Sequence, residues 1–205
     1  MSINPKIGGR RREYAEATKQ AILEAARELF TDHGYFATTV DEIAERARVA
    51  PATVYAVAGG KHGLLRKLIE ALTSSPIVAA TIAEIVEIDD AKEIIRIIAE
   101  NSRRMREEFG DIVRVMLVTA PHDDEVAKTV AAATAEYRRA LVPIAQQLAN
   151  LGALREGLEV DYAIDVLWFY FGYWGLFTLH DENGWSYERA EHWLRDAASQ
   201  ALLRS

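Results

Sequence analysis

The sequence predicts an all-α protein, with a small N-terminal three-helix domain followed by a larger helical bundle. Apolar residues recur at helical spacing through most of the 205 residues, which is the main local signal for an amphipathic helix. Capping residues, glycines and prolines divide this pattern into segments of helical length. The sequence contains no alternating runs long enough for a sheet and no internal repeat.

The first helix is predicted over residues 15–30, and Gly34 marks its end. Arg10, Arg11 and Arg12 form a short basic arm before this helix, for which a solvated tail is the alternative. One face of the helix collects the apolar side chains Ile22, Leu23, Ala26, Leu29 and Phe30.

Two short helices and a longer one follow. Thr38 and Thr39, which precede a run with early acidic residues, predict the start of a second helix that ends near residues 46–48. Pro51 opens a third helix of about two turns, because proline is favoured at the first helical position. The pair Gly59-Gly60 ends it, and a fourth helix is predicted over residues 61–72.

The clearest internal break is Ser74-Ser75-Pro76. It suggests three parts: an arm and helix-turn-helix domain (1–60), a connecting helix (61–75) and a second domain (76–205). In the second domain we expect a short apolar segment at 77–86 and helices at about 90–108, 111–119, 123–151, 161–179 and 186–203.

Composition excludes several classes of protein. The chain has no cysteine, so disulfide scaffolds, thiolate metal sites and cysteine nucleophiles are excluded. Its longest uncharged stretches, 166–179 and 71–83, are shorter than the roughly 20 residues of a membrane span. We therefore expect a soluble, cytoplasmic protein.

The net charge of −7 is unevenly distributed. Residues 1–75 carry 11 Lys and Arg against 9 Asp and Glu, a net charge of +2, while residues 76–205 carry 13 against 22, a net charge of −9. An acidic body would be repelled by nucleic acid, but a basic first part would not.

Residues 14–60 have the arrangement of a helix-turn-helix, in which a short third helix enters the major groove of DNA. Thr53 and Tyr55 on that helix suit base edges or phosphate oxygens, whereas Val54 points toward the apolar core. Thr38 and Thr39 at the start of the second helix offer an anion site for a backbone phosphate.

The chain resembles the N-terminal domain of TetR-type transcriptional regulators over residues 14–70. The resemblance is carried by Ile22-Leu23-x-Ala25-Ala26-x-x-Leu29-Phe30, Gly34-Tyr35, Thr38-Thr39-Val40-x-x-Ile43-Ala44, Val49, Thr53-Val54-Tyr55 and Lys61-x-x-Leu64-Leu65. It implies a homodimer with an all-helical ligand domain that releases DNA on ligand binding. It also implies recognition by Thr53 and Tyr55 and phosphate contacts at Thr39 and Lys61.

The chain departs from the family pattern at three positions. Arg48 replaces a common glycine in the turn, where a left-handed backbone would cost an arginine about 1–2 kcal/mol; a DNA contact and a solvated side chain are both open for it. Ala50 replaces the usual serine cap, and Ala58 replaces a common aromatic residue. The candidate DNA-binding residues are Arg11, Arg12, Thr38, Thr39, Arg48, Pro51, Ala52, Thr53, Tyr55 and Lys61.

The second domain offers a dimer surface and a ligand site. Aromatic residues surround the helix at 161–179, and small residues line the last helix, so we expect a four-helix interface between two copies; an intramolecular core is the alternative. The candidate interface residues are Tyr170, Trp174, Ala190, Trp193, Leu194, Ala197 and Ala201. The candidate ligand-binding residues, for which plain core packing is the alternative, are Asn101, Met105, Met116, Thr134, Tyr137, Trp168 and Phe171.

The sequence does not indicate an enzyme. The five histidines are scattered, and phosphate-binding, dinucleotide-binding and serine-hydrolase motifs are missing. The acids at 123–125 are explained by a helix start rather than by a metal, so we expect no metal and no cofactor. The predicted function is a ligand-responsive repressor that binds a palindromic DNA operator and releases it when a small hydrophobic or aromatic molecule binds. The alternative is a helical small-molecule-binding protein without DNA binding.

Overall fold

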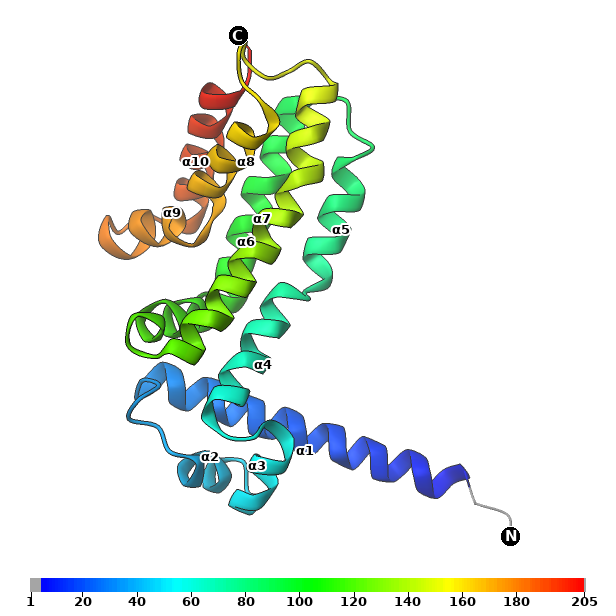
Figure 1. The fold of residues 1–205 in the computed structure, drawn as a ribbon, viewed down its shortest axis with the longest axis vertical. Helices are drawn as coiled ribbons and strands as arrows, with labels where there is room; N and C mark the ends of the chain where they lie inside the picture. The colour runs from blue at the N-terminus through cyan, green and yellow to red at the C-terminus, as the bar shows by residue number, and fades with distance from the viewer. Residues whose placement is uncertain (1–4, 205) are drawn as a thin grey trace. The chain divides into compact units, whose positions relative to one another are not determined.

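The computed structural model describes the backbone of residues 5–204 and the side chains of residues 12–204. This part of the chain is helical throughout (Figure 1), and its one β-type pairing is an isolated antiparallel bridge between Leu154 and Leu203. The chain forms two compact units. The first contains residues up to 71 together with 114–130, and the second contains 72–113 together with the residues from 131 onward.

The first unit is built on α1 (Pro5–Asp32), α2 (Val40–Arg46), α3 (Pro51–Ala58) and most of α4 (Lys61–Thr73). Within this unit α2 packs against both α1 and α3 (Figure 1). Its core consists of fully buried apolar side chains that recur at helical spacing in each helix, among them Ile22, Ala26, Phe30, Ile43, Val54, Leu64 and Leu65.

The start of α1 corrects one expectation. Residues 10–12 were expected to form an arm before the first helix, but α1 begins at Pro5, so they lie within it. Arg and Lys are good helix formers even where no apolar face exists. Periodicity therefore could not detect this polar extension.

The expected starts and ends of the short helices are confirmed. Thr39 caps α2, its hydroxyl accepting from the Glu42 amide at 3.2 Å while the Glu42 carboxylate accepts from the Thr39 amide at 2.7 Å. This reciprocal pair satisfies two backbone donors that a helix start leaves open. Pro51 begins α3, and Gly59 ends it in the left-handed conformation, with φ +73°.

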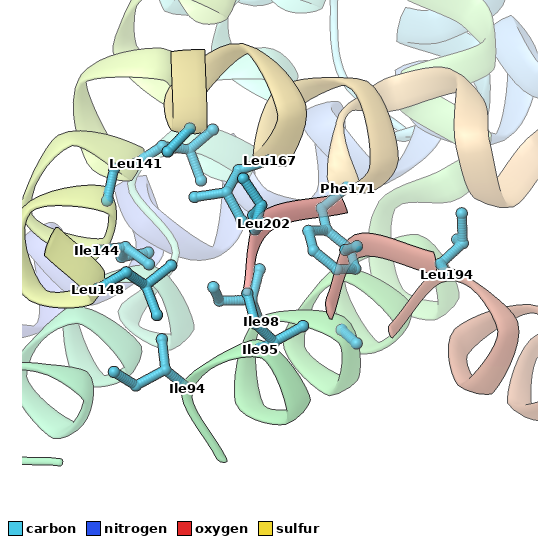
Figure 2. Packing of buried hydrophobic residues seen from close by; sticks show 14 of the residues in the cluster. Ile94, Ile95, Ile98, Leu141, Ile144, Leu148, Leu167, Phe171, Leu194 and Leu202 are labelled. Atoms are coloured by element: carbon cyan, nitrogen blue, oxygen red, sulfur yellow. The ribbon is translucent and has the colours of Figure 1, made fainter. Parts of the chain in front are cut away.

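The second unit contains α5 (Pro76–Ile85), most of α6 (Ala91–Thr119) and α7 (Asp124–Asn150), and the C-terminal helices α8 (Val160–Phe171), α9 (Tyr173–Phe177) and α10 (Tyr187–Leu202). Their apolar faces meet in one core (Figure 2), whose members include Ile94, Ile98, Leu141, Ile144, Leu148, Leu167, Phe171, Leu194 and Leu202. At the edge of this core Arg103 of α6 pairs with Glu191 of α10, with Nε and Oε2 2.5 Å apart.

The structure defines one expected segment of the second domain further and shows that another expectation was wrong. The segment at 77–86 is a helix, α5, capped by the Ser75 hydroxyl, which accepts from the Ile77 amide. The helices expected at 90–108 and 111–119 are one helix, α6, which continues through a buried glycine at 110. Buried apolar residues on both sides of that glycine outweigh its low helix propensity of about 1 kcal/mol.

The stretch Lys61–Ile85 is long and apolar enough, by composition alone, to cross a membrane. The Ser75 cap and Pro76 divide it into α4, of 13 residues, and α5, of 10 residues. Each helix is shorter than the roughly 20 residues that a single span requires.

The helix expected at 161–179 is interrupted at Gly172, which separates α8 from α9. A Cβ atom at this position would lie 2.3 Å from the Trp168 carbonyl oxygen and about 3 Å from the Trp168 ring, so only glycine fits. A π-helical turn over Thr178–Glu182 follows α9. Sequence periodicity missed the break because this segment is apolar around its whole circumference.

Substitution of Arg48 measures the backbone strain in the turn between α2 and α3. It has φ +57° and is the one non-glycine residue with positive φ in the described backbone. Because the left-handed region costs a side chain about 1–2 kcal/mol and glycine much less, Arg48→Gly is expected to raise the free energy of unfolding by about 1 kcal/mol. Urea denaturation followed by circular dichroism measures this.

Gly59→Ala is the matched control, because nothing lies within 4 Å of a Cβ added there and only backbone strain changes. It is expected to lower the free energy of unfolding by about 1 kcal/mol. An Arg48→Gly protein as stable as the original, or less stable, would contradict the strain assigned to this turn.

Candidate functional site

The α2–α3 pair is held in place by contacts around the two helices. At the end of α2 the Arg46 guanidinium contacts the Glu28 carboxylate of α1, with Nη2 and Oε2 2.5 Å apart. In the turn the Val49 amide donates to the Ala44 carbonyl at 2.9 Å. The amide and hydroxyl of Thr39 donate to Glu42 and lower the pKa of that carboxyl. The two helices are thereby fixed with respect to each other before any partner binds.

The α3 helix has one buried and one exposed face. Val54 is completely buried, whereas Tyr55 is 56 % exposed. Pro51 and Ala52 are exposed at the start of the helix, and Thr53 is half-buried. Ala50 precedes them without a side-chain cap. A two-turn helix seated through a single valine, with a phenol and small side chains outward, has the shape of a helix that can enter a major groove.

Lys61, at the start of α4, is engaged within the first unit. Its ammonium donates to the carbonyl oxygens of Tyr35 (2.8 Å) and Phe36 (3.3 Å) and lies 4.7 Å from the centre of the Tyr35 ring. Burial lowers the pKa of Lys61, and burial raises the pKa of Tyr35 to about 12. Lys61 therefore fastens the loop after α1 to the start of α4.

The remaining residues of the expected DNA surface differ in exposure. Thr38 is only 1 % exposed, and its hydroxyl donates to the carbonyl oxygens of Leu29 (3.1 Å) and Gly34 (2.9 Å). Its side chain thus closes the link between α1 and α2 instead of facing outward. Thr39, Arg12 and Arg48 are exposed. Arg11 lies outside the residues whose side chains the structure describes.

Asp123 starts α7, as the acidic run at 123–125 indicates. Its Oδ1 accepts from the amides of Glu125 (3.1 Å) and Val126 (3.0 Å), and its Oδ2 lies 2.9 Å from Nε2 of His62. The bond from the Val126 amide is the main cause of the lowered pKa of Asp123. Among the described residues, no group of three or more His, Asp or Glu side chains is placed to hold a metal ion.

The second unit contains a cavity of about 380 Å³. This volume lies in the range of pockets that hold small molecules. It opens between the end of α4, α5, α6, α7 and the start of α9, and most of its wall is apolar. The apolar wall residues include Leu72, Ile77, Val78, Ile82, Ile98, Leu141 and Ile144.

One end of the cavity is polar, and the helix break at Gly172 explains why. The Phe171 carbonyl accepts from the Ser102 hydroxyl (3.1 Å) and the Tyr137 hydroxyl (2.7 Å), and the Gly172 carbonyl accepts from Nη2 of Arg106 (2.9 Å). All three donors line the cavity. Buried carbonyls that a helix break releases need such donors.

The structure brings together part of the expected ligand site. Asn101, Met105 and Tyr137 line the cavity. Trp168 packs on Tyr137 with ring centres 5.3 Å apart, and Phe171 is buried in the core (Figure 2). Met116 belongs to the first unit. Met116, Thr134, Trp168 and Phe171 are not among the cavity-lining residues, so the expected ligand roles of these four are not supported by the geometry.

Sequence reasoning missed Ser102, Arg106 and Tyr173, as well as the whole contribution of α5. One signal was available: Ile98, Ser102 and Arg106 are spaced by four residues and share a face with the apolar stripe of α6. An arginine on that face predicts a buried charge.

The residues expected at a dimer surface divide into two groups. Ala190 and Leu194 are buried in the core of the protomer, which agrees with the intramolecular alternative for these two. Trp174 and Trp193 are exposed, and so are Phe169, at 74 %, and Tyr162. Phe169 and Tyr162 were not among the expected residues, although their spacing of seven places them on one side of α8.

Comparisons with known proteins agree with this arrangement. Residues 22–68, which contain the helix-turn-helix, match the family described as bacterial regulatory proteins, tetR family. The chain is 28 % identical over 156 residues to YvkB of Bacillus subtilis, an uncharacterized HTH-type transcriptional regulator, covering 76 % of this chain and 80 % of that one.

Two solved structures extend the similarity to the second unit. The TetR family regulator PfmR of Thermus thermophilus is 25 % identical, with a TM-score of 0.66 and coverage of 88 % of this chain and 93 % of that one. The regulator FadR of Bacillus subtilis, solved with stearoyl-CoA, shares the fold at 18 % identity, with a TM-score of 0.74 and coverage of 89 % and 98 %. The helix-turn-helix segment at 22–68 therefore matches the TetR family, a family of non-enzymes, and the chain as a whole is similar to DNA-binding, helix-turn-helix transcriptional regulators.

Proposed function

We propose that the protein is a ligand-responsive repressor, which binds a palindromic operator as a homodimer and releases it when a small apolar molecule occupies the cavity of the second unit. The observation that carries this proposal is the combination, in one chain, of an outward-facing α3 helix and a mostly apolar cavity of about 380 Å³. The first feature suits DNA and the second suits an effector.

The DNA surface we propose is the exposed side of α3, with Tyr55, Thr53, Pro51 and Ala52 facing the major groove. Thr39, Arg48, Arg11 and Arg12 are proposed to contact phosphates. Lys61 would add positive charge near the same surface, although its ammonium is already held by two carbonyls. The side chain of Thr38 is omitted because it is buried. A repressor of chromosomal DNA would act in the cytoplasm.

The dimer surface we propose is the outer side of α8 and α10 together with α9. These three helices pack on one another within the protomer (Figure 1). They present the exposed aromatic residues Tyr162, Phe169, Trp174 and Trp193, and Tyr170, Ala197 and Ala201 are half-buried. Large exposed aromatic side chains in one region indicate a surface that another protein covers. Two such protomers would place their α3 helices about 34–36 Å apart on a palindromic operator.

The effector we propose is a small molecule with a hydrophobic body. The apolar wall of the cavity supports this. The stearoyl-CoA bound to the similarly folded FadR, a molecule with a long apolar chain, also supports it. An effector that binds better to a protomer arrangement unsuited to DNA would shift the population away from the operator.

Substitution of Tyr55 tests the DNA surface. Tyr55→Ala removes a major-groove contact without touching the buried Val54, so affinity for DNA from the promoter region of the chain's own gene is expected to fall about 10- to 100-fold. Fluorescence anisotropy at two salt concentrations measures it, and sedimentation is expected to show an unchanged dimer. Val142→Ala, exposed on α7 in the second unit, is the control.

Wild-type protein that shows no salt-dependent, sequence-selective binding to this DNA would contradict the repressor function. In that case the alternative of a small-molecule-binding protein without DNA binding is favoured.

Substitution of Phe169 tests the dimer surface. Phe169→Glu places a charge on the proposed interface, where it would be buried without a partner, so the dimer dissociation constant is expected to rise at least about a hundredfold. Sedimentation equilibrium measures it. Val118→Glu changes a similarly exposed valine of the first unit and is expected to leave the dimer intact. A dimer that tolerates both substitutions would show that α8 is not at the interface.

A further inference from the structure

We propose that the cavity of the second unit takes a neutral molecule: an apolar body with one hydroxyl-type group, which donates a hydrogen bond to the side-chain amide of Asn101 and accepts one from it. The inference rests on the proposed function, because it names the chemical class of the effector. It starts from the hydrogen bonds that the polar side chains of the cavity wall already make.

The hydroxyl groups of the wall are largely used inside the protein. The Ser102 and Tyr137 hydroxyls both donate to the Phe171 carbonyl, at 3.1 Å and 2.7 Å. The Thr81 hydroxyl donates to the Ile77 carbonyl at 2.7 Å. A hydroxyl has one hydrogen to donate, so these three side chains have none left to donate to a ligand.

The charged side chains of the wall are engaged as well. Arg106 is held, among other contacts, by the Gly172 carbonyl at 2.9 Å and by the ring of Tyr173. Glu136 and Arg139 form an ion pair with each other. In the described wall a charged ligand would therefore meet no charged side chain that lacks a partner, and burial of its charge would be costly. The wall thus favours a neutral molecule.

Asn101 differs from these side chains. It is half-buried in the wall, and its amide has no hydrogen-bond partner among the described residues, whereas the other polar wall residues, Thr73 and Tyr173, have partners. The spacing of Ile98, Asn101 and Met105 places the amide on the cavity face of α6. A side-chain amide has two donor hydrogens and an acceptor oxygen, so it can both donate to a hydroxyl-type group and accept from it.

A second hollow indicates where the polar group of the ligand would lie. This hollow has a volume of about 390 Å³, lies between α5 and α6, and shares Ile77, Thr81 and Asn101 with the cavity. Its remaining wall includes charged side chains of both signs, among them Arg96 and Glu100. Asn101 therefore lies where the apolar cavity meets more polar surroundings. A ligand would place its polar group there and its apolar body inside the cavity.

The apolar body would contact the core side of the cavity. Ile98 lies almost one turn before Asn101 on α6, and it belongs to the same core cluster as Leu141 and Ile144 of α7 (Figure 2). Burial of apolar surface against these side chains would supply most of the binding free energy. The hydrogen bonds at Asn101 would set the orientation of the ligand.

Four probes with one apolar body separate hydrogen bonding from charge: 4-butylbenzyl alcohol, its methyl ether, 4-butylbenzoate and 4-butylbenzylamine. Isothermal titration of the wild-type full-length protein at neutral pH is expected to give the tightest binding for the alcohol, because the ether accepts a hydrogen bond but cannot donate one. The two charged probes are expected to bind at least about tenfold more weakly than the alcohol. An ether or a charged probe that binds as tightly as the alcohol, or an alcohol that does not bind, would overturn the proposal.

Variants assign the preference to Asn101. Leucine has nearly the shape of asparagine but no hydrogen-bonding group, so in Asn101→Leu the affinity of the alcohol relative to the ether is expected to fall about tenfold. Asn150→Leu makes the same change at the end of α7, outside the cavity-lining residues, and is expected to keep the wild-type ratio. If Asn101→Leu fails to fold, Asn101→Ala and the wild-type series still decide. An unchanged ratio in folded Asn101→Leu would overturn the role of Asn101.

Promoter DNA keeps this proposal separate from the proposed function. If the alcohol binds as expected but leaves the protein–DNA complex intact, the cavity chemistry holds and the repressor mechanism fails. If a charged probe binds best and releases the DNA, the repressor mechanism holds and the neutral-ligand proposal fails.

Discussion

Two backbone carbonyls, those of Phe171 and Gly172, determine much of the second unit. They lie at the break between α8 and α9, and buried carbonyls without donors are costly. Ser102, Tyr137 and Arg106 supply the donors. Because these side chains must reach the break, α6 and α7 carry polar groups on otherwise apolar faces, and the cavity beside them acquires its polar end. Ser102, Tyr137 and Arg106 therefore line the cavity and also hold the helix break at Gly172, so a molecule in the cavity would contact the side chains that fix this break.

The first unit depends on a different arrangement, in which a very short helix is made rigid by its neighbours. An eight-residue helix is marginal alone, so α3 relies on the burial of Val54 and on capping of the adjacent α2. Lys61 donates to a carbonyl of the loop after α1, and Thr38 donates to the Leu29 carbonyl of α1 itself, so both side chains help to fix the position of α2 and α4. Tyr55 is then exposed on a surface that is already ordered. The conformational entropy of this surface is lost on folding, so it does not have to be lost again when DNA binds.

The sequence predicted the first unit better than the second, for physical reasons. Local signals determine α2 and α3: the threonines before α2, its early acidic residues and Pro51 predicted where the two helices start, and the positions of Val54 and Tyr55 predicted which face of α3 is buried. The break at Gly172 was not readable, because a segment that is apolar on all sides shows no periodicity. The spacing of Ile98, Ser102 and Arg106 was a local signal that Arg106 is buried, but the cavity that it lines is formed by helices distant in sequence and could not be predicted. Arg48 kept the left-handed turn that its side chain disfavours, which shows that tertiary contacts outweighed the local preference.

The central claim is that the cavity and the DNA surface are coupled in one molecule. Coupling between two sites is reciprocal, so an effector that weakens DNA binding must itself bind less tightly when DNA is bound. The direct measurement is the dissociation constant of a small apolar probe, 4-butylbenzyl alcohol, for the free protein and for the protein saturated with its promoter DNA. A repressor of this kind predicts binding at least about fivefold weaker in the presence of DNA. Equal affinity in the two states would contradict the claim.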